Sequence, residues 1–244
     1  MNESKAATKI RQFDADFDRW VARNPGGKFS AFSAIETSKR LKNGASHATL
    51  GTKLKNGNNW AIDGLANCQL VYDLGGVNPE TKICDYGCGN LRVGVHVIDR
   101  QAPGSYFGID VSEYLIAEGI RLVGDDVIRR KRPVLGTIKE RLDDVVEAAV
   151  DITFSFNVSS HIHPDEQDAY VGNLKAICHK PGARLLLNVV TFQEPVRFQP
   201  SGWAWTIPHY VDWFAPMKLI DTVFYGSSDR AGMVIEGHRL TFQR

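Results

Sequence analysis

Between residues 82 and 190 the sequence alternates short apolar runs with stretches of helical periodicity, and this alternation limits the fold more than any other feature. Short β-like runs separated by helices are typical of a parallel sheet covered by helices on both faces. The runs expected to be strands are Lys82–Tyr86, Ser105–Asp110, Pro133–Ile138, Ile152–Phe156 and Arg184–Val190. We therefore predict a doubly wound α/β domain.

The C-terminal part of the sequence departs from this alternation. Lys218–Tyr225 and Met233–Thr241 are β-like runs joined by the loop Gly226–Gly232, which suits an antiparallel hairpin. The prediction is a Rossmann-like, mostly parallel sheet of seven strands that the hairpin closes without another crossover helix.

Residues 1–60 are predicted to form a helical extension to a domain made by residues 61–244. One helix ends at Asn24–Gly27, a second is expected over Phe29–Leu41, and Asn43–Asn59 has the composition of a loop. The extension carries eleven Lys and Arg against five Asp and Glu. Two interpretations stay open. It is a lid over a pocket for an acidic molecule, or a pair of structural helices on the back face of the sheet.

Composition excludes several classes of protein. The 244 residues are 43% hydrophobic and 23% charged, which is typical of a globular domain, and the net charge of +1 argues against nucleic acid as partner. No apolar stretch is long enough to span a membrane and the N-terminus is too polar for a secretory signal, so we expect a cytoplasmic protein. The four cysteines form no CxxC pair, which indicates neither zinc nor disulfides. The oligomeric state is left open.

The strongest local signal follows the first expected strand, in the segment Asp85–Asn90 (DYGCGN). Gly87 and Gly89 let backbone N–H groups approach a ligand, and a helix begins directly afterwards with the positive end of its dipole at the same place. The next strand ends in Asp110, about 20 residues further on, where a carboxylate can accept hydrogen bonds from both hydroxyls of a ribose. These features together predict a site for a nucleotide-like cofactor.

These motifs resemble those of the class I S-adenosylmethionine-dependent methyltransferases. Asp85, Gly87 and Gly89 match the acidic-x-Gly-x-Gly motif of that family, and Asp110 matches its ribose-binding acid. The resemblance extends over about residues 80–190, and the terminal hairpin is also a trait of the family. It implies S-adenosylmethionine as the cofactor and S-adenosylhomocysteine as the product.

The family motif is not matched throughout, and NAD is the rival cofactor. The third glycine of the family motif is replaced by Leu91, which puts close backbone contact there in doubt. Arg92 stands where a dinucleotide site has Gly or Ala for close helix packing, so the methyltransferase interpretation is favoured.

The resemblance assigns further residues to the cofactor site. The expected cofactor-binding residues are Asp85, Gly87, Cys88, Gly89, Arg92, Asp110, Val111, Glu140 and Asn157. Arg92 would meet the methionine carboxylate or is a surface residue of the first helical turn. Val111 would flank the adenine, and Glu140 would meet its amino group. Asn157 would lie near the transferable methyl, or it forms an ordinary turn.

His161 and His163 are the expected catalytic residues. An H-x-H-x-D pattern invites a metal site, but no further ligand stands nearby, so no metal is predicted. His161 is the first candidate for a general base, since an imidazole can remove a proton from a hydroxyl or amine as the methyl arrives.

A cluster of aromatic residues precedes the terminal hairpin. It contains the expected substrate-contacting residues Trp203, Trp205, His209 and Tyr210. These side chains form a wall or lid for the methyl acceptor, or they are a packed cover of the sheet.

The sequence thus predicts an enzyme that transfers a methyl group from S-adenosylmethionine to a hydroxyl or amine of a small molecule, such as a sugar or a natural-product intermediate. The alternatives are an RNA or protein methyltransferase and a non-catalytic protein that binds the cofactor.

Overall fold

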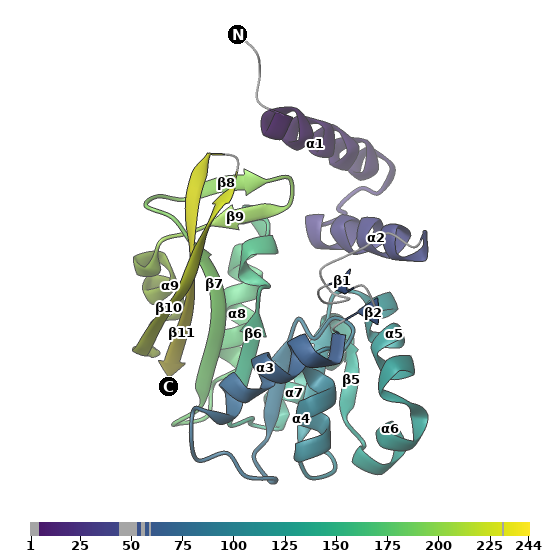
Figure 1. Ribbon diagram of the computed structural model, residues 1–244, viewed down its shortest axis with the longest axis vertical. Coiled ribbons are helices and arrows are strands. Elements are labelled where there is room, and N and C mark those ends of the chain that lie inside the picture. Colours follow the sequence, from purple (N-terminus) through teal and green to yellow (C-terminus); the bar gives the residue numbers. More distant parts are fainter. Residues whose placement is uncertain (1–4, 44–52, 55–56, 59, 231) are drawn as a thin grey trace.

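The computed structural model of the protein describes residues 5–43, 53–54, 57–58, 60–230 and 232–244, and a seven-stranded sheet lies at its centre (Figure 1). The strands lie in the order β10-β11-β7-β6-β3-β4-β5. Their bounds are β3 (Ile83–Tyr86), β4 (Tyr106–Asp110), β5 (Val134–Thr137), β6 (Ile152–Phe156), β7 (Arg184–Thr191), β10 (Lys218–Arg230) and β11 (Met233–Gln243). The predicted seven-stranded α/β sheet is confirmed.

Strand direction in this sheet is parallel except at β11. Strands β3 to β7 pair in parallel, whereas β11 pairs antiparallel with both β7 and β10. Strand β10 therefore points the same way as β7. The carboxyl ends of β3, β4 and β6 share one edge of the sheet, and the loops that follow these strands meet there.

Helices cover both faces of the sheet. One face carries α7 (Ile138–Glu147), α8 (Gln167–Ile177) and α9 (Ile207–Phe214), and the other carries α3 (Trp60–Tyr72), α4 (Gly94–Arg100), α5 (Glu113–Val123) and α6 (Asp125–Lys131). Successive strand side chains enter opposite cores, because they alternate across a strand. In β3, Ile83 packs under α3 and α4, and Cys84 packs on the side of α7 and α8. Within the described residues, no helix has the length and apolar character needed to cross a membrane.

The connection from β7 to β10 corrects one prediction. We expected the hairpin to follow without a crossover helix, but α9 lies in this connection. A crossover is needed because β10 is parallel to β7. The chain must therefore return from the carboxyl end of β7 to the side of the sheet where the strands begin. Tyr210 and Phe214 of α9 are fully buried in the core, and the Thr206 side chain caps the helix by accepting from the His209 N–H. An antiparallel pair, β8 (Val196–Gln199) with β9 (Gly202–Ala204), precedes α9.

Two N-terminal helices, α1 (Lys5–Arg23) and α2 (Phe29–Lys42), lie beyond the carboxyl edge of the sheet, at the top of Figure 1. Five aromatic side chains hold them together: Phe13, Phe17, Trp20, Phe29 and Phe32. The expected loop Asn43–Asn59 falls largely outside the described residues, apart from the short pair β1 (Lys53–Leu54) and β2 (Gly57–Asn58). The division at residue 60 stays a prediction.

Helix α3 closely approaches the backbone just before α4 at Gly64. A β-carbon on Gly64 would overlap the carbonyl oxygen of Arg92 and lie 2.7 Å from its carbonyl carbon. We expect Gly64→Ala to lower the free energy of unfolding by about 1–3 kcal/mol, because the crowded atoms belong to the backbone. The matched control is Gly172→Ala in α8, where no atom lies within 4 Å; helix propensity should raise stability there by about 0.5–1 kcal/mol. Urea unfolding measures both changes, and equal stability of the two variants would contradict the close approach.

Candidate functional site

The loop after β3 has a backbone that glycine suits. Gly87 and Gly89 have φ values of 85° and 52°, in the left-handed region. A β-carbon on Gly87 would overlap the Val158 side chain, whereas one on Gly89 would meet nothing within 4 Å. The N–H groups of Gly87 and Cys88 donate to the Ile109 carbonyl at 2.7 and 3.1 Å. The loop is therefore fixed to the end of β4 and has open space beside Gly89.

Asp110 ends β4 and holds this loop in place. Its carboxylate accepts hydrogen bonds from the Gly89 N–H at 2.9 Å and from the Ser112 N–H at 2.8 Å, through different oxygens. Burial raises the pKa of Asp110 above its usual value, and the backbone N–H donors oppose that shift. Each carboxylate oxygen has two lone-pair sites, so each can accept one further hydrogen bond from a ligand hydroxyl.

Asp85 lies beside Asp110, on the neighbouring strand β3. Its carboxyl is buried and accepts a hydrogen bond from the Tyr106 hydroxyl at 2.9 Å. Burial raises the pKa of Asp85 to about 7, the Tyr106 hydrogen bond opposes this shift, and the nearby Asp110 adds to it. Among the described residues, Arg92 is the cation that acts on Asp85, and two buried acids side by side attract a further positively charged group. Tyr106 was not among the residues selected from sequence, since its contact crosses between strands.

The structure brings several of the other expected cofactor residues to the same edge. Cys88 is buried in the glycine loop, and Val111, directly after Asp110, is 50% exposed. Asn157 follows β6 with a φ of 59°, next to the Val158 that packs on Gly87. Arg92 lies 3.9 Å from Asp63 of α3 in a partly buried ion pair.

Glu140 has a local partner instead. Its carboxylate accepts from the N–H of Thr137 at 3.0 Å and from the Thr137 hydroxyl at 2.8 Å. This is a capping box at the start of α7, for which Thr-x-x-Glu is the sequence signal. An adenine contact of Glu140 stays a prediction.

The two histidines lie in different surroundings. His161 is exposed, and its Nδ1 lies 2.7 Å from the Ser201 carbonyl oxygen, which can only accept a hydrogen bond. The proton of the neutral ring is therefore on Nδ1, and Nε2 carries the lone pair that a base needs. His163 instead stacks on Phe29 at 4.9 Å and meets the edge of Trp203 at 5.3 Å. Its Nδ1 accepts from the Asp165 N–H at 3.2 Å. Because Phe29 belongs to α2, the His163 ring packs against that helix.

The expected substrate residues lie close to this histidine loop. Trp203 is in β9 and is 6% exposed, whereas Trp205 is half-buried. Tyr210 is fully buried, and its hydroxyl donates to Ser159 Oγ at 3.2 Å, beneath the turn that carries His161. The side chain of His209 bonds to the Thr206 hydroxyl at 2.8 Å. In the described part of the chain, no group of three or more His, Cys, Asp or Glu could hold a metal ion.

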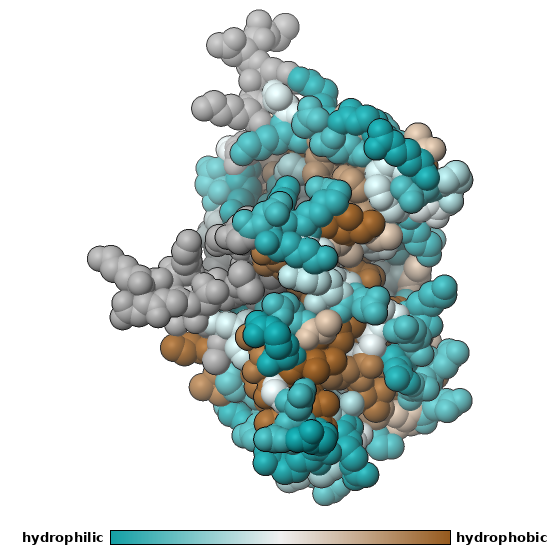
Figure 2. Space-filling view, turned by 90° about the vertical axis from the view of Figure 1, so that its right-hand side faces the viewer, coloured by the Kyte–Doolittle hydropathy of each residue, from teal (hydrophilic) through white to brown (hydrophobic). Residues whose placement is uncertain are grey.

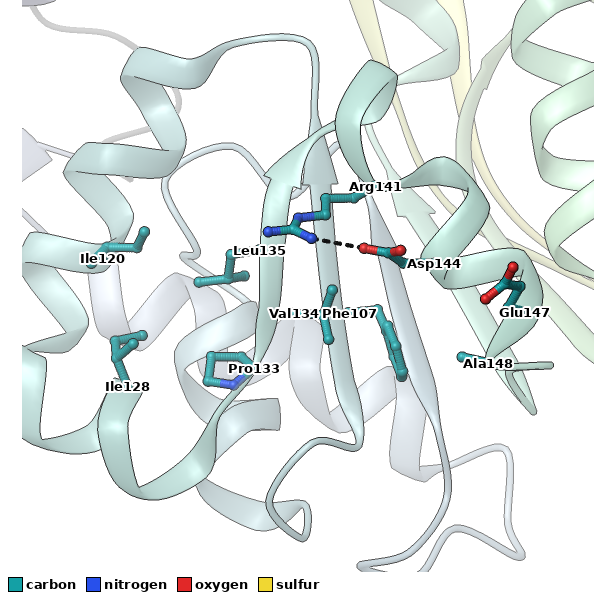
Figure 3. Close-up of a pocket in the computed structure, with 10 residues that line it drawn as sticks. All are labelled: Phe107, Ile120, Ile128, Pro133, Val134, Leu135, Arg141, Asp144, Glu147 and Ala148. Carbon is teal, nitrogen blue, oxygen red and sulfur yellow. Dashed lines mark hydrogen bonds and ion pairs between the residues drawn. The ribbon is translucent and has the colours of Figure 1, made fainter.

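Two surface hollows lie away from these residues. One, of about 560 Å³, surrounds the edge strand β5 and is lined by apolar side chains and by the Arg141–Asp144 ion pair (Figure 3). Figure 2 shows the molecule from the right-hand side of Figure 1, where apolar side chains gather in the lower half. The other, of about 370 Å³, lies around Asn78, Asp151 and Lys180, next to the amino ends of the strands. Neither hollow contains Asp85 or Asp110, so the candidate site rests on the chemistry of the carboxyl edge.

Comparisons with known proteins identify the fold. No family model and no curated protein matches the sequence. Magnesium protoporphyrin IX methyltransferase from Synechocystis PCC 6803, solved with bound S-adenosylmethionine, is similar with a TM-score of 0.53 at 13% identity, over 100% of this chain and 98% of that one. The cyclase SpnF gives 0.60 at 15% identity, over 87% and 94%. Geranyl diphosphate methyltransferase gives 0.56 at 11% identity, over 73% and 77%. The chain has the class I methyltransferase fold.

These similarities confirm the fold that was implied by the resemblance of the motifs around Asp85 and Asp110. Identities of 11–15% establish architecture alone. SpnF is named a cyclase, and one fold supports unrelated reactions, so the reaction must be argued from the site.

Proposed function

We propose that this protein is an S-adenosylmethionine-dependent methyltransferase that acts on a hydroxyl or amine of a small molecule. The observation that carries the proposal is the pair of buried carboxyls, Asp85 and Asp110, beside a glycine loop that has open space at Gly89. That magnesium protoporphyrin IX methyltransferase was solved with S-adenosylmethionine and also with S-adenosylhomocysteine supports the same cofactor and product here.

The residues present fit this donor. Asp110 has acceptor capacity for the two ribose hydroxyls, Asp85 suits a cationic group of the methionyl part, and the exposed Val111 offers an apolar surface to the adenine. When bound, S-adenosylmethionine supplies a methyl group already activated by the sulfonium. The chain then has to align the acceptor, exclude water and accept a proton. His161 Nε2 is our candidate for the proton acceptor.

A small acceptor is supported by the neighbouring structures. Proteins of this fold are named for, or were solved with, magnesium protoporphyrin IX, geranyl diphosphate and phosphomonomethylethanolamine. The last turn of α2 carries Lys39, Arg40 and Lys42, and Lys42 lies 4.9 Å from the Tyr114 ring of α5, near the end of β4. A cationic turn at this edge suits an acceptor with negative charge.

Helices α1 and α2 are proposed to be the lid of this site. Arg197 of β8 makes two hydrogen bonds to the Asp14 carboxylate, at 3.0 and 2.7 Å. The Glu166 carboxylate accepts from the Ser30 N–H at 2.9 Å, at the start of α2. These contacts join the helices to the loops of the carboxyl edge, which favours the lid over a scaffold on the back face.

Calorimetry with the purified protein tests the cofactor. We expect binding of S-adenosylmethionine and S-adenosylhomocysteine and no binding of NAD or NADP, because Asp85 and Arg92 suit the first pair. Binding of NAD without a response to either sulfur compound would overturn the assignment. Transfer of label from methyl-labelled donor to a metabolite pool would exclude a non-catalytic binder. Salt-dependent retention on RNA, with labelling of the RNA, would indicate the nucleic-acid alternative.

A further inference from the structure

Tyr106 is a large side chain that the surrounding structure accommodates with two glycines. It lies at the start of β4, is 2% exposed and donates its hydroxyl to Asp85 at 2.9 Å. A β-carbon on Gly94 of α4 would overlap the Tyr106 hydroxyl and lie 2.9 Å from Cζ. A β-carbon on Gly108 would lie 3.0 Å from the ring at Cε1. The ring therefore occupies space left free by a glycine of α4 and by a glycine of its own strand β4, and its hydroxyl contacts the Asp85 carboxylate.

We propose that Tyr106 is a positioning residue of the donor site, whose hydroxyl holds the Asp85 carboxylate in the ionised form and orientation that receive the ammonium group of the donor. This rests on the function proposed above and names a residue that acts on the ligand through Asp85. Burial alone would not require this arrangement, because a phenylalanine would fill the same volume without bringing a hydroxyl to a carboxyl.

The charges around Asp85 make its ionisation sensitive to that one hydrogen bond. The ionisable groups that act on its ionisation are Tyr106, Asp110 and Arg92. Asp85 in turn raises the pKa of three thiols around it, which are Cys68, Cys84 and Cys88. Burial raises the pKa of Cys84 and Cys88 well above the usual value, so these thiols are neutral, and Asp110 disfavours a second negative charge. Arg92 is the cation in this set and also pairs with Asp63. The Tyr106 hydroxyl is thus a main stabiliser of the charged carboxylate.

The direction of the pH dependence follows from the pKa of Asp85, which is raised to about 7 by burial and opposed by the Tyr106 bond. An ammonium ligand prefers the ionised carboxylate, so its affinity should rise as the pH increases through about 7, and binding below that pH should release a proton. Between about pH 4 and 7, Asp85 of the ligand-free protein is protonated in the folded state and ionised in the unfolded state. The free energy of unfolding should therefore fall as the pH rises through this interval.

Tyr106→Phe keeps the ring and removes the hydroxyl. S-adenosylhomocysteine is the probe, because it carries the ammonium group and is not turned over. Calorimetry from pH 5.5 to 8.5, in buffers of different ionisation enthalpy, gives affinity and protons released. We expect the midpoint of the wild-type affinity profile near pH 7 to move up by about 0.5–1 unit in Tyr106→Phe, which weakens binding at pH 7 by about 2- to 5-fold. Affinity should recover towards wild type at the alkaline end.

Tyr170→Phe is the matched control. Tyr170 is also buried, and its hydroxyl donates to Ser155 Oγ at 3.1 Å on the other face of the sheet. The Tyr170→Phe variant should leave the pH midpoint of binding unchanged, even if it lowers stability as much as Tyr106→Phe does. Asp85→Asn has no carboxyl to ionise at this position and should remove the contribution of Asp85 to the pH dependence, both in calorimetry and in urea unfolding of the ligand-free protein.

The outcomes separate this inference from the proposed function. An unchanged midpoint in Tyr106→Phe, or an equal shift in Tyr170→Phe, would overturn the role of Tyr106 while the cofactor assignment stands. If the wild-type protein binds neither sulfur compound, the proposed function fails. The unfolding experiment still tests the hydrogen bond in that case, because Tyr106→Phe should move the pH dependence of stability to higher pH and Tyr170→Phe should not.

Discussion

Replacing Asp110 with alanine is expected to weaken the binding of S-adenosylmethionine by about 1.5–3 kcal/mol, which is about 10- to 150-fold in affinity. Two losses combine in this effect. The ribose hydroxyls lose a charged acceptor in a buried place, and the Gly89 and Ser112 N–H groups lose the carboxylate that holds them. The glycine loop should therefore lose its fixed position as well as a ligand contact. Calorimetry with S-adenosylhomocysteine measures the change.

A surface aspartate provides the control for this substitution. Asp126 of α6 has a side chain that is 90% exposed, and its partner is Arg129, one turn further along the helix. Asp126→Ala should leave affinity unchanged, because exposed ion pairs contribute little. Far-UV circular dichroism should show a native fold for both variants. A folded Asp110→Ala protein with wild-type affinity would show that Asp110 does not hold the ribose.

Deleting residues 1–43 is expected to reduce turnover by about 100-fold or more and to leave the affinity for S-adenosylhomocysteine little changed. The residues assigned to the donor lie after the deleted segment, on the loops of β3, β4 and β6. The deletion removes the helices over the carboxyl edge, together with Asp14 and the Ser30 N–H that contact β8 and Glu166. Without this cover, water would reach the acceptor and its alignment would be lost. Turnover measured with labelled donor and binding measured by calorimetry separate the two effects.

A point variant makes the same test without removing a helix. Asp14→Ala breaks the two hydrogen bonds to Arg197, which has the Trp203 ring 5.1 Å away, and should lower turnover in the same direction but less than the deletion. Asp16→Ala, which removes a partner of Arg19 within α1, is the matched control and should leave turnover unchanged. An insoluble or unfolded deletion protein would favour the scaffold interpretation of the two helices.

The parts of the fold that sequence predicted well are those fixed by local pattern. Ile152–Phe156 was predicted and observed with the same bounds, because a short run rich in β-branched and aromatic residues follows Asp151 and ends at a turn. The glycine loop was predicted because glycine tolerates left-handed backbone, which Gly87 and Gly89 adopt. Asp110 was selected because an acid at the end of a second strand lies at the edge where ligands bind.

The parts that sequence did not predict depend on contacts between distant segments. Helix α9 contains Pro208 and several aromatic residues, a composition that also suits a loop. In the structure, Tyr210 and Phe214 are buried against the sheet and stabilise the helix. The pair Asp14–Arg197 joins residues 183 positions apart, and no local pattern signals it. Tyr106 is similar, since its hydroxyl bond to Asp85 crosses between neighbouring strands.

The insertion of β8 and β9 between β7 and α9 has its own small hydrophobic cluster. Phe198, Ala204 and Ile235 form its centre, separate from the two large cores that support the donor residues. Because the clusters are separate, we expect substitutions in this one to change the packing near Trp203 of β9 and to leave the packing beneath Asp85 unchanged. On the function proposed above, the residues around the acceptor can therefore change in evolution while the residues that bind the donor stay the same. This separation of the two parts would let related chains bind the same donor and act on different acceptors.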